Sequence, residues 1–151
     1  MTLAYVAVGA NLGDAQATVR WAVQALADVV QTRLRACSSL YRSAPVDAGG
    51  PDFINAVVAV DTDLTAPALL AALQDLEQQS GRVRTHRNAP RTLDLDLLMF
   101  GQARMDSASL QLPHPRMYQR AFVLLPLAEL DAQLVSSADL DAVSQQVISR
   151  I

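Results

Sequence analysis

The order of hydrophobic patterns along the chain predicts an α+β fold with a ferredoxin-like, split βαβ core. Alternating runs typical of strands and runs with helical spacing follow one another as strand, helix, strand, strand, helix, strand. This order is typical of a mainly antiparallel sheet with helices packed on it. The chain has 151 residues, enough for a substantial core, so we expect a single domain over residues 1–151.

The first half of this core is predicted by alternation, helical spacing and turn residues. Residues 3–9 alternate and are rich in Val and Ala, which indicates a strand, and a turn with two glycines follows. Asp14 is a candidate N-cap for a helix that extends to about residue 30. Residues 33–42 predict one further strand, and a loop rich in Gly and Pro separates it from a strand over 53–61.

The second half repeats the helix and strand. A helix begins near Pro67, because proline is favoured in a first turn, and Gly81 is predicted to end it. The run from Asp94 to Phe100 predicts the last core strand. Residues 117–130 have helical character, but Pro126 predicts a break between two short helices. The C-terminal residues are weakly patterned.

Composition narrows the class of function. The chain contains no lysine, so a P-loop lysine, a Schiff base and a lysine nucleophile are excluded. The net charge of −3 argues against general affinity for nucleic acid. No apolar run reaches the length of a membrane span, so we expect no membrane partner. The single cysteine excludes an internal disulfide and favours a cytoplasmic location.

Two carboxylates, Asp94 and Asp96, begin the last predicted core strand. Residues two apart on a strand share a face, so both acids should point the same way, with Leu95 and Leu97 on the opposite face. Two like charges this close repel each other and favour a cation between them. Mg²⁺ is typically held by one or two carboxylates and completed by water and phosphate oxygens. The pair is therefore a candidate site for a metal–nucleotide complex.

Arginines are concentrated just before the two acids. Arg82, Arg84, Arg87 and Arg91 lie within one ten-residue stretch. The planar guanidinium fork suits phosphate, so the stretch predicts a site for a small anion rather than a polyanion. The alternative at this point is that the arginines are solvated surface side chains and that the Asp-x-Asp pair is incidental.

Two further polar residues allow two interpretations each. Asn55 shares a strand face with Phe53 and Val57, where an amide needs hydrogen-bond partners. It either faces water at an edge or binds the polar edge of a flat ligand that stacks on Phe53. His114 lies between two prolines, which hold it in extended geometry. A surface turn and a rigidly aimed phosphate donor both explain it.

Longer motifs carry a resemblance to a known family, and they occur in the family's order. They are Ala7–Asp14, Ser38–Pro45, Asp52–Ala56, Glu77 with Gly81–Arg84, Arg87-x-Ala89-Pro90-Arg91-x-x-Asp94-Leu95-Asp96-Leu97-Leu98, and Leu112–Arg116 with Arg120 and Phe122. Over roughly residues 2–130 the chain resembles the 6-hydroxymethyl-7,8-dihydropterin pyrophosphokinases, enzymes of folate biosynthesis. Where many members have an aromatic residue before the signature's Gly-Pro, this chain has Asn88-Ala89. Phe53 replaces the commoner tyrosine, and Ala44 replaces a proline.

The resemblance implies that pyrophosphate is transferred from ATP to the hydroxymethyl group of the dihydropterin, giving AMP and the pterin diphosphate. It implies two Mg²⁺ ions held by Asp94 and Asp96, catalytic roles for these acids and for Arg82 and Arg91, and a monomer. The implied pterin-binding residues are Ser43, Ala44, Val46, Phe53, Asn55, Asp94 and Phe122. The implied ATP-binding residues are Gln74, Glu77, Arg82, Arg84, Arg91, Leu97, His114 and Arg120.

Two hypotheses from other classes can be compared with this one. A different two-metal phosphotransferase or phosphohydrolase would use the aspartates but predicts nothing about Phe53, Asn55 and Phe122. A ferredoxin-like nucleotide- or RNA-binding module would need stacking aromatics on an exposed sheet and a basic surface. The aromatic content of 5% and the acidic balance count against the module.

Overall fold

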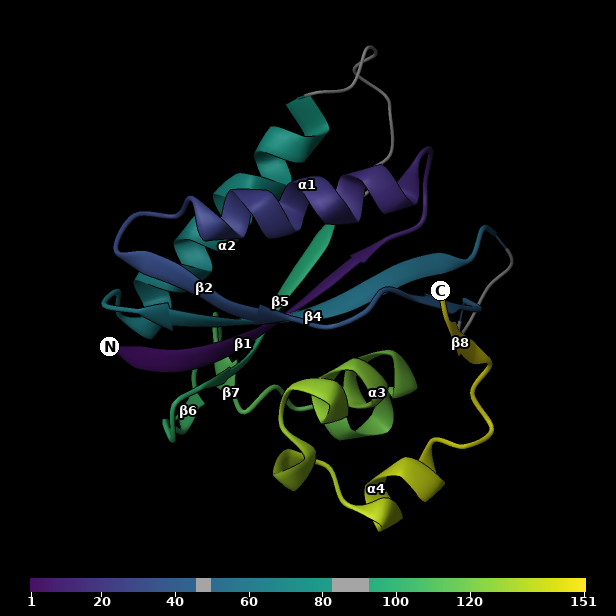
Figure 1. Ribbon diagram of the computed structural model, residues 1–151. Coiled ribbons are helices and arrows are strands. Elements are labelled where there is room, and N and C mark those ends of the chain that lie inside the picture. The colour runs from purple at the N-terminus through teal and green to yellow at the C-terminus, as the bar shows by residue number, and fades with distance from the viewer. Residues whose placement is uncertain (46–49, 83–92) are drawn as a thin grey trace.

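The computed structural model describes residues 1–45, 50–82 and 93–151, with the side chain of Arg82 left out. Figure 1 shows a sheet between two layers of helices. The helices α1 (Ala15–Ala27) and α2 (Ala66–Arg82) cover one face, and α3 (Ala121–Leu130) and α4 (Ser137–Ala142) lie on the other. Among the described residues, no helix is both long and apolar enough to cross a membrane.

The strands confirm the predicted order of the core. They are β1 (Thr2–Ala10), β2 (Thr32–Cys37), β3 (Tyr41–Ser43), β4 (Phe53–Thr62), β5 (Asp94–Phe100), β6 (Met105–Asp106), β7 (Gln111–Leu112) and β8 (Ile148–Arg150). The main sheet runs β5-β1-β4-β3-β8, with β2 also paired to β4, and every pair in it is antiparallel. The strands β6 and β7 form a separate hairpin. The α+β, ferredoxin-like prediction is therefore confirmed.

The central strands β1 and β4 are apolar on both sides, because helices cover both faces of the sheet. Ala4, Val6 and Val8 face α1 and α2, and belong to the larger hydrophobic core. Tyr5 and Ala7 face the second core, which is formed largely by α3. A half-exposed sheet would leave one of these rows polar. The layer on the second face is what encloses the site described below.

The predicted single strand over 33–42 is wrong, because Ser38 interrupts it. The Ser38 hydroxyl accepts a hydrogen bond of 2.9 Å from the Val57 backbone N–H, in the place where a ladder carbonyl would be. The backbone N–H of Ser38 donates to the Val57 carbonyl at 2.9 Å. The strand therefore ends at Cys37 and a new one starts at Tyr41.

The predicted break at Pro126 is also wrong. The helix α3 continues through Pro126, and the chain bends instead at Arg120, between the 3-10 helix η1 (Met117–Gln119) and α3. A helical proline costs about 3 kcal/mol, but burial of each large apolar side chain contributes about 1.5–3 kcal/mol. Leu124 and Leu127, both at 0% exposure, pack on the second core, so tertiary packing outweighs the cost.

The C-terminal residues, weakly patterned in sequence, are ordered by the sheet. A second 3-10 helix, η2 (Ala132–Leu134), and α4 lead to β8, which pairs with β3 at the sheet edge. A polar cluster connects the β3–β8 edge of the sheet to α3. Glu129 of α3 accepts hydrogen bonds from the hydroxyls of Tyr41 and Ser39, and it forms an ion pair with Arg150 at 3.3 Å. Burial and the neighbouring carboxylate raise the pKa of Tyr41 to about 12, so its phenol is a donor at neutral pH.

We expect Tyr41→Phe to lower the free energy of unfolding by about 1.5–3 kcal/mol, because it removes a hydrogen bond to a carboxylate. Urea denaturation monitored by circular dichroism measures the loss. Tyr118→Phe is the control, since Tyr118 is 41% exposed and donates only to the Leu134 carbonyl. Equal losses in the two variants would show that the Glu129 cluster adds nothing to stability.

Candidate active site

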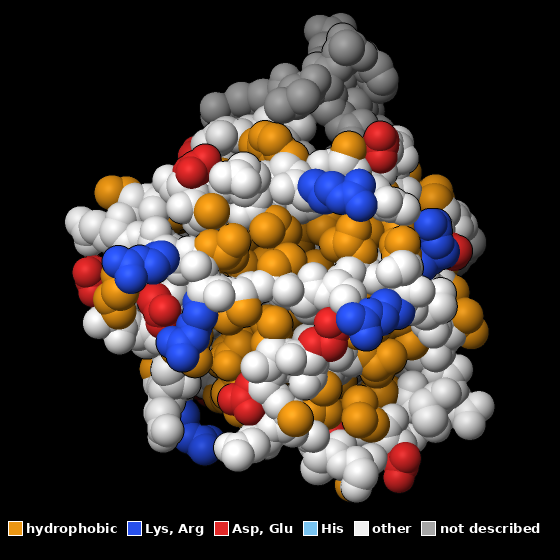
Figure 2. All heavy atoms as spheres, viewed as in Figure 1, with side chains coloured by type: hydrophobic (Ala, Val, Ile, Leu, Met, Phe, Trp, Pro, Cys, Tyr) orange, Lys and Arg blue, Asp and Glu red, His pale blue; other side chains and the backbone are white. Residues whose placement is uncertain are grey.

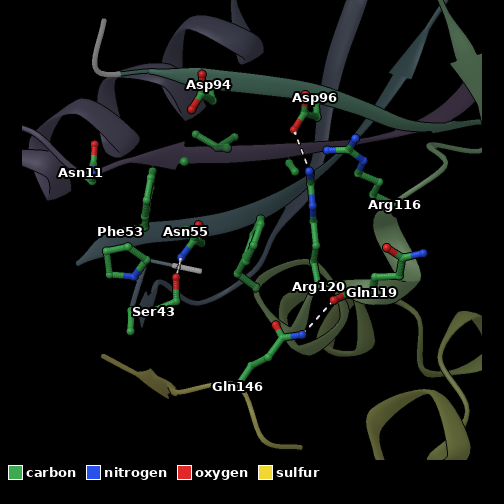
Figure 3. A pocket seen from close by; sticks show the side chains of 16 residues that line it. Asn11, Ser43, Phe53, Asn55, Asp94, Asp96, Arg116, Gln119, Arg120 and Gln146 are labelled. Atoms are coloured by element: carbon green, nitrogen blue, oxygen red, sulfur yellow. Dashed lines mark hydrogen bonds and ion pairs between the residues drawn. The ribbon is translucent and has the colours of Figure 1, made fainter. Parts of the chain in front are cut away.

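A cavity of about 820 Å³ opens on the α3 face of the sheet. Its floor is formed by β1, β4 and β5, and its sides by the end of β3 and by the turn between η1 and α3. Figure 3 shows polar side chains from these elements converging on it. Apolar and charged side chains therefore meet in one concave space, as in small-molecule sites.

The two acids lie on the β5 wall of this cavity, on one face of the strand. Asp94 is exposed and the side chain of Asp96 is 43% exposed, whereas Leu95 and Leu97 are buried on the opposite face at 5% and 3%. The predicted shared face is confirmed. Small residues lie opposite them on β1, with Gly9 opposite Asp94 and Ala7 opposite Asp96, so the space in front of the carboxylates stays open.

A cation from α3 already faces one of the acids. The Arg120 guanidinium lies 3.7 Å from an Asp96 carboxylate oxygen (Figure 3). It also lies over the Phe122 ring, 5.5 Å from the ring centre. Such long, partly exposed pairs contribute at most about 1 kcal/mol. Arg120 can therefore exchange Asp96 for a ligand phosphate at little cost. Arg116 lines the same cavity.

The other end of the cavity is shaped to bind a flat, polar molecule. Asn55 is only 3% exposed and donates a hydrogen bond of 2.8 Å to the Ser43 hydroxyl. The interpretation of Asn55 as a water-facing edge residue is therefore wrong. Phe53, Phe122 and Ala44 line the same space, so the structure brings together the predicted pterin-binding residues that it describes.

A second cavity of about 360 Å³ adjoins the first, and Asp96 lines both. Its apolar lining includes Leu70, Leu97 and Leu110, and His114 stands at its border. The predicted ATP residues Leu97 and His114 therefore lie together, beside the acids. Asp96 is therefore the lining residue that the two cavities share.

Hydrogen bonds fix both the position and the tautomer of His114. Its backbone N–H donates to the Leu98 carbonyl at 2.8 Å, and its ring Nδ1 accepts from the Arg116 backbone N–H at 3.1 Å. Burial lowers the pKa of His114 below its usual value of 6.5, Asp96 opposes this, and Arg120 and Arg116 lower it further. A neutral imidazole at pH 7 then carries its proton on Nε2, as a donor.

Two predicted ATP residues line neither cavity. The Glu77 carboxylate accepts a hydrogen bond of 2.9 Å from the Leu95 backbone N–H, so it fixes β5 between the two acids. Gln74 lies on the exposed side of α2. Val46, Arg84 and Arg91, the side chain of Arg82, and the Asn88-Ala89 position lie outside the described residues.

Comparison with known proteins decides the family. The model of the family described as 7,8-dihydro-6-hydroxymethylpterin-pyrophosphokinase (HPPK) matches residues 5–132. The chain belongs to this family. The sequence-based predictions of this family, and of a pyrophosphokinase enzyme, are therefore confirmed, and the two hypotheses from other classes are set aside.

Relatives in the HPPK family support the same assignment. The chain is 47% identical over 131 residues to the 2-amino-4-hydroxy-6-hydroxymethyldihydropteridine pyrophosphokinase of Pseudomonas aeruginosa, covering 86% of this chain and 81% of that one. It is 40% identical over 139 residues to the enzyme of the same name from Bacillus subtilis, covering 90% and 82%.

Solved structures agree on the fold. One described as HPPK-DHPS in complex with substrates superimposes with a TM-score of 0.68 at 12% identity, and wild-type Plasmodium falciparum HPPK-DHPS with 0.64 at 13%. The matches cover 85% and 86% of this chain but only 40% of each of those chains.

The sequence analysis did not predict a site role for several residues that line the larger cavity. Arg116 ends the Leu112–Arg116 motif, and its charge directly after Pro115 could have indicated a binding role. Gly9 belongs to the glycine turn for which close backbone approach was considered, but its place between Asn55 and Asp94 across the sheet was not predicted. Gln119 and Gln146 also line the cavity, and nothing in their sequence context indicates it.

Proposed function

We propose that this enzyme transfers the pyrophosphoryl group of ATP to the hydroxymethyl oxygen of 6-hydroxymethyl-7,8-dihydropterin, with Asp94 and Asp96 as the ligands of two Mg²⁺ ions. The observation that carries this proposal is the position of Asp96 at the junction of the two cavities. The pterin occupies the larger cavity and the nucleotide base the smaller one. The triphosphate then passes the carboxylates.

The larger cavity has the chemistry that a pterin ring needs. Phe53 and Phe122 offer apolar plates for the two faces of the ring, and stacking on such plates adds about 0.5–1.5 kcal/mol beyond burial. Asn55 and the backbone at Ser43 and Ala44 offer polar groups for the ring's edge. Phe53 lacks the hydroxyl of a tyrosine but keeps the plate.

The smaller cavity fits the nucleotide. Its leucines can cover an adenine ring, and neutral His114 can donate from Nε2 to a phosphate or ribose oxygen. Arg116 and Arg120 border the path between the cavities. We propose ATP contacts for Gln74, Glu77, Arg82, Arg84 and Arg91 as well, on the resemblance alone.

The donor set fits magnesium. Asp94 and Asp96 offer two carboxylates on one face of β5, both lining the larger cavity. Mg²⁺ suits two carboxylates completed by water and phosphate oxygens. When bound, it neutralises charge on the triphosphate and aligns its oxygens.

The chain's own contribution is binding and orientation. The hydroxymethyl oxygen attacks the β-phosphorus and releases its proton to water, while the bond from the β-phosphorus to the α,β-bridging oxygen breaks and AMP leaves with the electron pair on that oxygen. Arg120 faces the oxygens where charge gathers, and guanidinium groups stabilise such charge. No side-chain nucleophile is needed.

The direct test incubates the purified chain with Mg²⁺, ATP and the hydroxymethyl-dihydropterin and separates nucleotides by chromatography. We expect AMP and pterin diphosphate in equal amounts, and no AMP without magnesium. ADP or free phosphate in place of AMP would reject the proposal. We further propose a cytoplasmic monomer, since Cys37 is unpaired and one chain lines both cavities. Light scattering tests the monomer.

Gly9→Ala should weaken pterin binding about 5- to 10-fold, because the added Cβ would lie 3.3 Å from Asn55 Oδ1 and displace the amide. Fluorescence titration of the pterin measures the dissociation constant. Gly81→Ala is the control, since its added Cβ would meet nothing within 4 Å. Unchanged affinity in Gly9→Ala would mean that the Asn55 amide does not bind the ring.

A further inference from the structure

Gln146 joins the C-terminal segment to the cavity although it lies outside residues 5–132, the part matched by the family description. It is partly buried, between α4 and β8, and lines the larger cavity. Its Oε1 accepts a hydrogen bond of 2.9 Å from the Ala121 backbone N–H, and its Nε2 donates one of 2.8 Å to the Gln119 carbonyl. Figure 3 shows Gln146 beneath the backbone that carries Arg120.

The first of these hydrogen bonds compensates for a missing helix cap. The first N–H groups of a helix have no partner within it, and a Ser, Thr, Asp or Asn at the N-cap normally accepts from one of them. The N-cap of α3 is Arg120, whose side chain makes no capping bond. Gln146 supplies the acceptor from 25 residues away and leaves Arg120 available to the cavity.

The turn that Gln146 holds carries two of the cavity's binding groups. Arg120 lies between the two bonded backbone groups and reaches Asp96 at 3.7 Å. Phe122 follows directly, with the Arg120 guanidinium over its ring. A shift of this turn would therefore move a cation and an aromatic plate together.

The segment that contains Gln146 also forms hydrogen bonds with the β3 side of the cavity. The Ala44 backbone N–H donates to the Val147 carbonyl at 3.1 Å, and Ser43 is paired with Ile148. Residues 146–148 therefore connect the pterin-edge loop to the turn before α3. No other described segment is bonded to both walls in this way by consecutive residues.

We propose that Gln146 is a positioning residue for the pterin substrate: it fixes the turn over 119–121, and with it Phe122 and Arg120, in the geometry that receives the ring. Both polar groups of its amide are engaged by backbone, so it acts through the turn rather than on the reacting atoms. The proposal rests on the proposed function and adds a residue that determines substrate affinity.

The test compares Gln146→Met with Gln145→Met in the full chain. Methionine keeps the length of the side chain but removes both hydrogen bonds, and Gln145 is the exposed neighbour. We expect the pterin dissociation constant and KM to rise about tenfold in Gln146→Met, the order expected for lost hydrogen bonds to backbone. The Ala121 amide should exchange faster in Gln146→Met, and kcat should fall as well because the turn also carries Arg120, whereas Gln145→Met should match the parent protein in every measurement.

Pterin affinity within twofold of the parent in Gln146→Met would overturn the proposal, and so would an equal loss in Gln145→Met. If Gln146→Met does not fold, Gln146→Glu decides, because it keeps the acceptor for Ala121 but loses the donor and places a carboxylate against the Gln119 carbonyl. A rise of threefold or more in its dissociation constant supports the proposal, and a smaller one overturns it. Absence of AMP formation by the parent protein would instead contradict the proposed function, whatever the rate of amide exchange at Ala121.

Discussion

Asp96→Ala is expected to lower kcat by about 10²–10³-fold or more, the range seen when a group that stabilises transition-state charge is removed. Asp96 faces both cavities, so its loss affects the metal ligands at the point where the two substrates meet. The fold should persist, because the side chain is 43% exposed and its ion pair with Arg120 is long, at 3.7 Å. Steady-state AMP formation measures the loss, with circular dichroism as the check on folding.

The matched control is Asp141→Ala, which removes an exposed carboxylate on α4. Its turnover should equal that of the parent protein. Asp96→Asn adds a further comparison, since it keeps the shape of the side chain but removes the charge and should still lose most of the activity. If Asp96→Ala turned over at the parent rate, the acids would not be the metal ligands.

Asn55→Leu is expected to raise the pterin dissociation constant about 100-fold. The substitution keeps the branched shape of the side chain but removes both a donor and an acceptor from a buried position, and each unmatched polar group of the ligand costs about 1–3 kcal/mol. Asn55 is 3% exposed, so water cannot replace the lost partner. Fluorescence titration with the pterin, without nucleotide, isolates this effect from catalysis.

Ser43→Ala serves as the graded comparison. It removes the hydroxyl that accepts from Asn55 at 2.8 Å but leaves the amide in place, so we expect a rise of only about 5-fold. ATP binding should be unchanged in both variants. A larger effect from Ser43→Ala than from Asn55→Leu would contradict the role given to the amide.

Elements with strong local signals were predicted correctly. The acids Asp94 and Asp96 share a face because strand geometry alone requires it. Asp14 caps α1 as expected, accepting from the Ala17 N–H at 3.1 Å. Failures occurred where tertiary contacts overrule local preference: Ser38 splits a strand through its bond to Val57, and burial carries α3 through Pro126.

The candidate site could be predicted only in part from the sequence, for a physical reason. Sequence motifs name residues whose chemistry is visible in their type, such as Asp96 and Arg120. They do not show which distant backbone groups a neutral amide will bond. Gln146 is of this kind, since its partners Gln119 and Ala121 lie 27 and 25 residues away.

The sequence alone determined the core order of strands and helices, the shared face of the two carboxylates and the family, because these depend on local periodicity and residue type. The tertiary structure decided that two cavities meet at Asp96, that Asn55 is buried against Ser43, and that the C-terminal segment contributes Gln146 to the lining of the larger cavity. Those features arise from contacts between segments far apart in the chain, and packing over the whole sheet selects them.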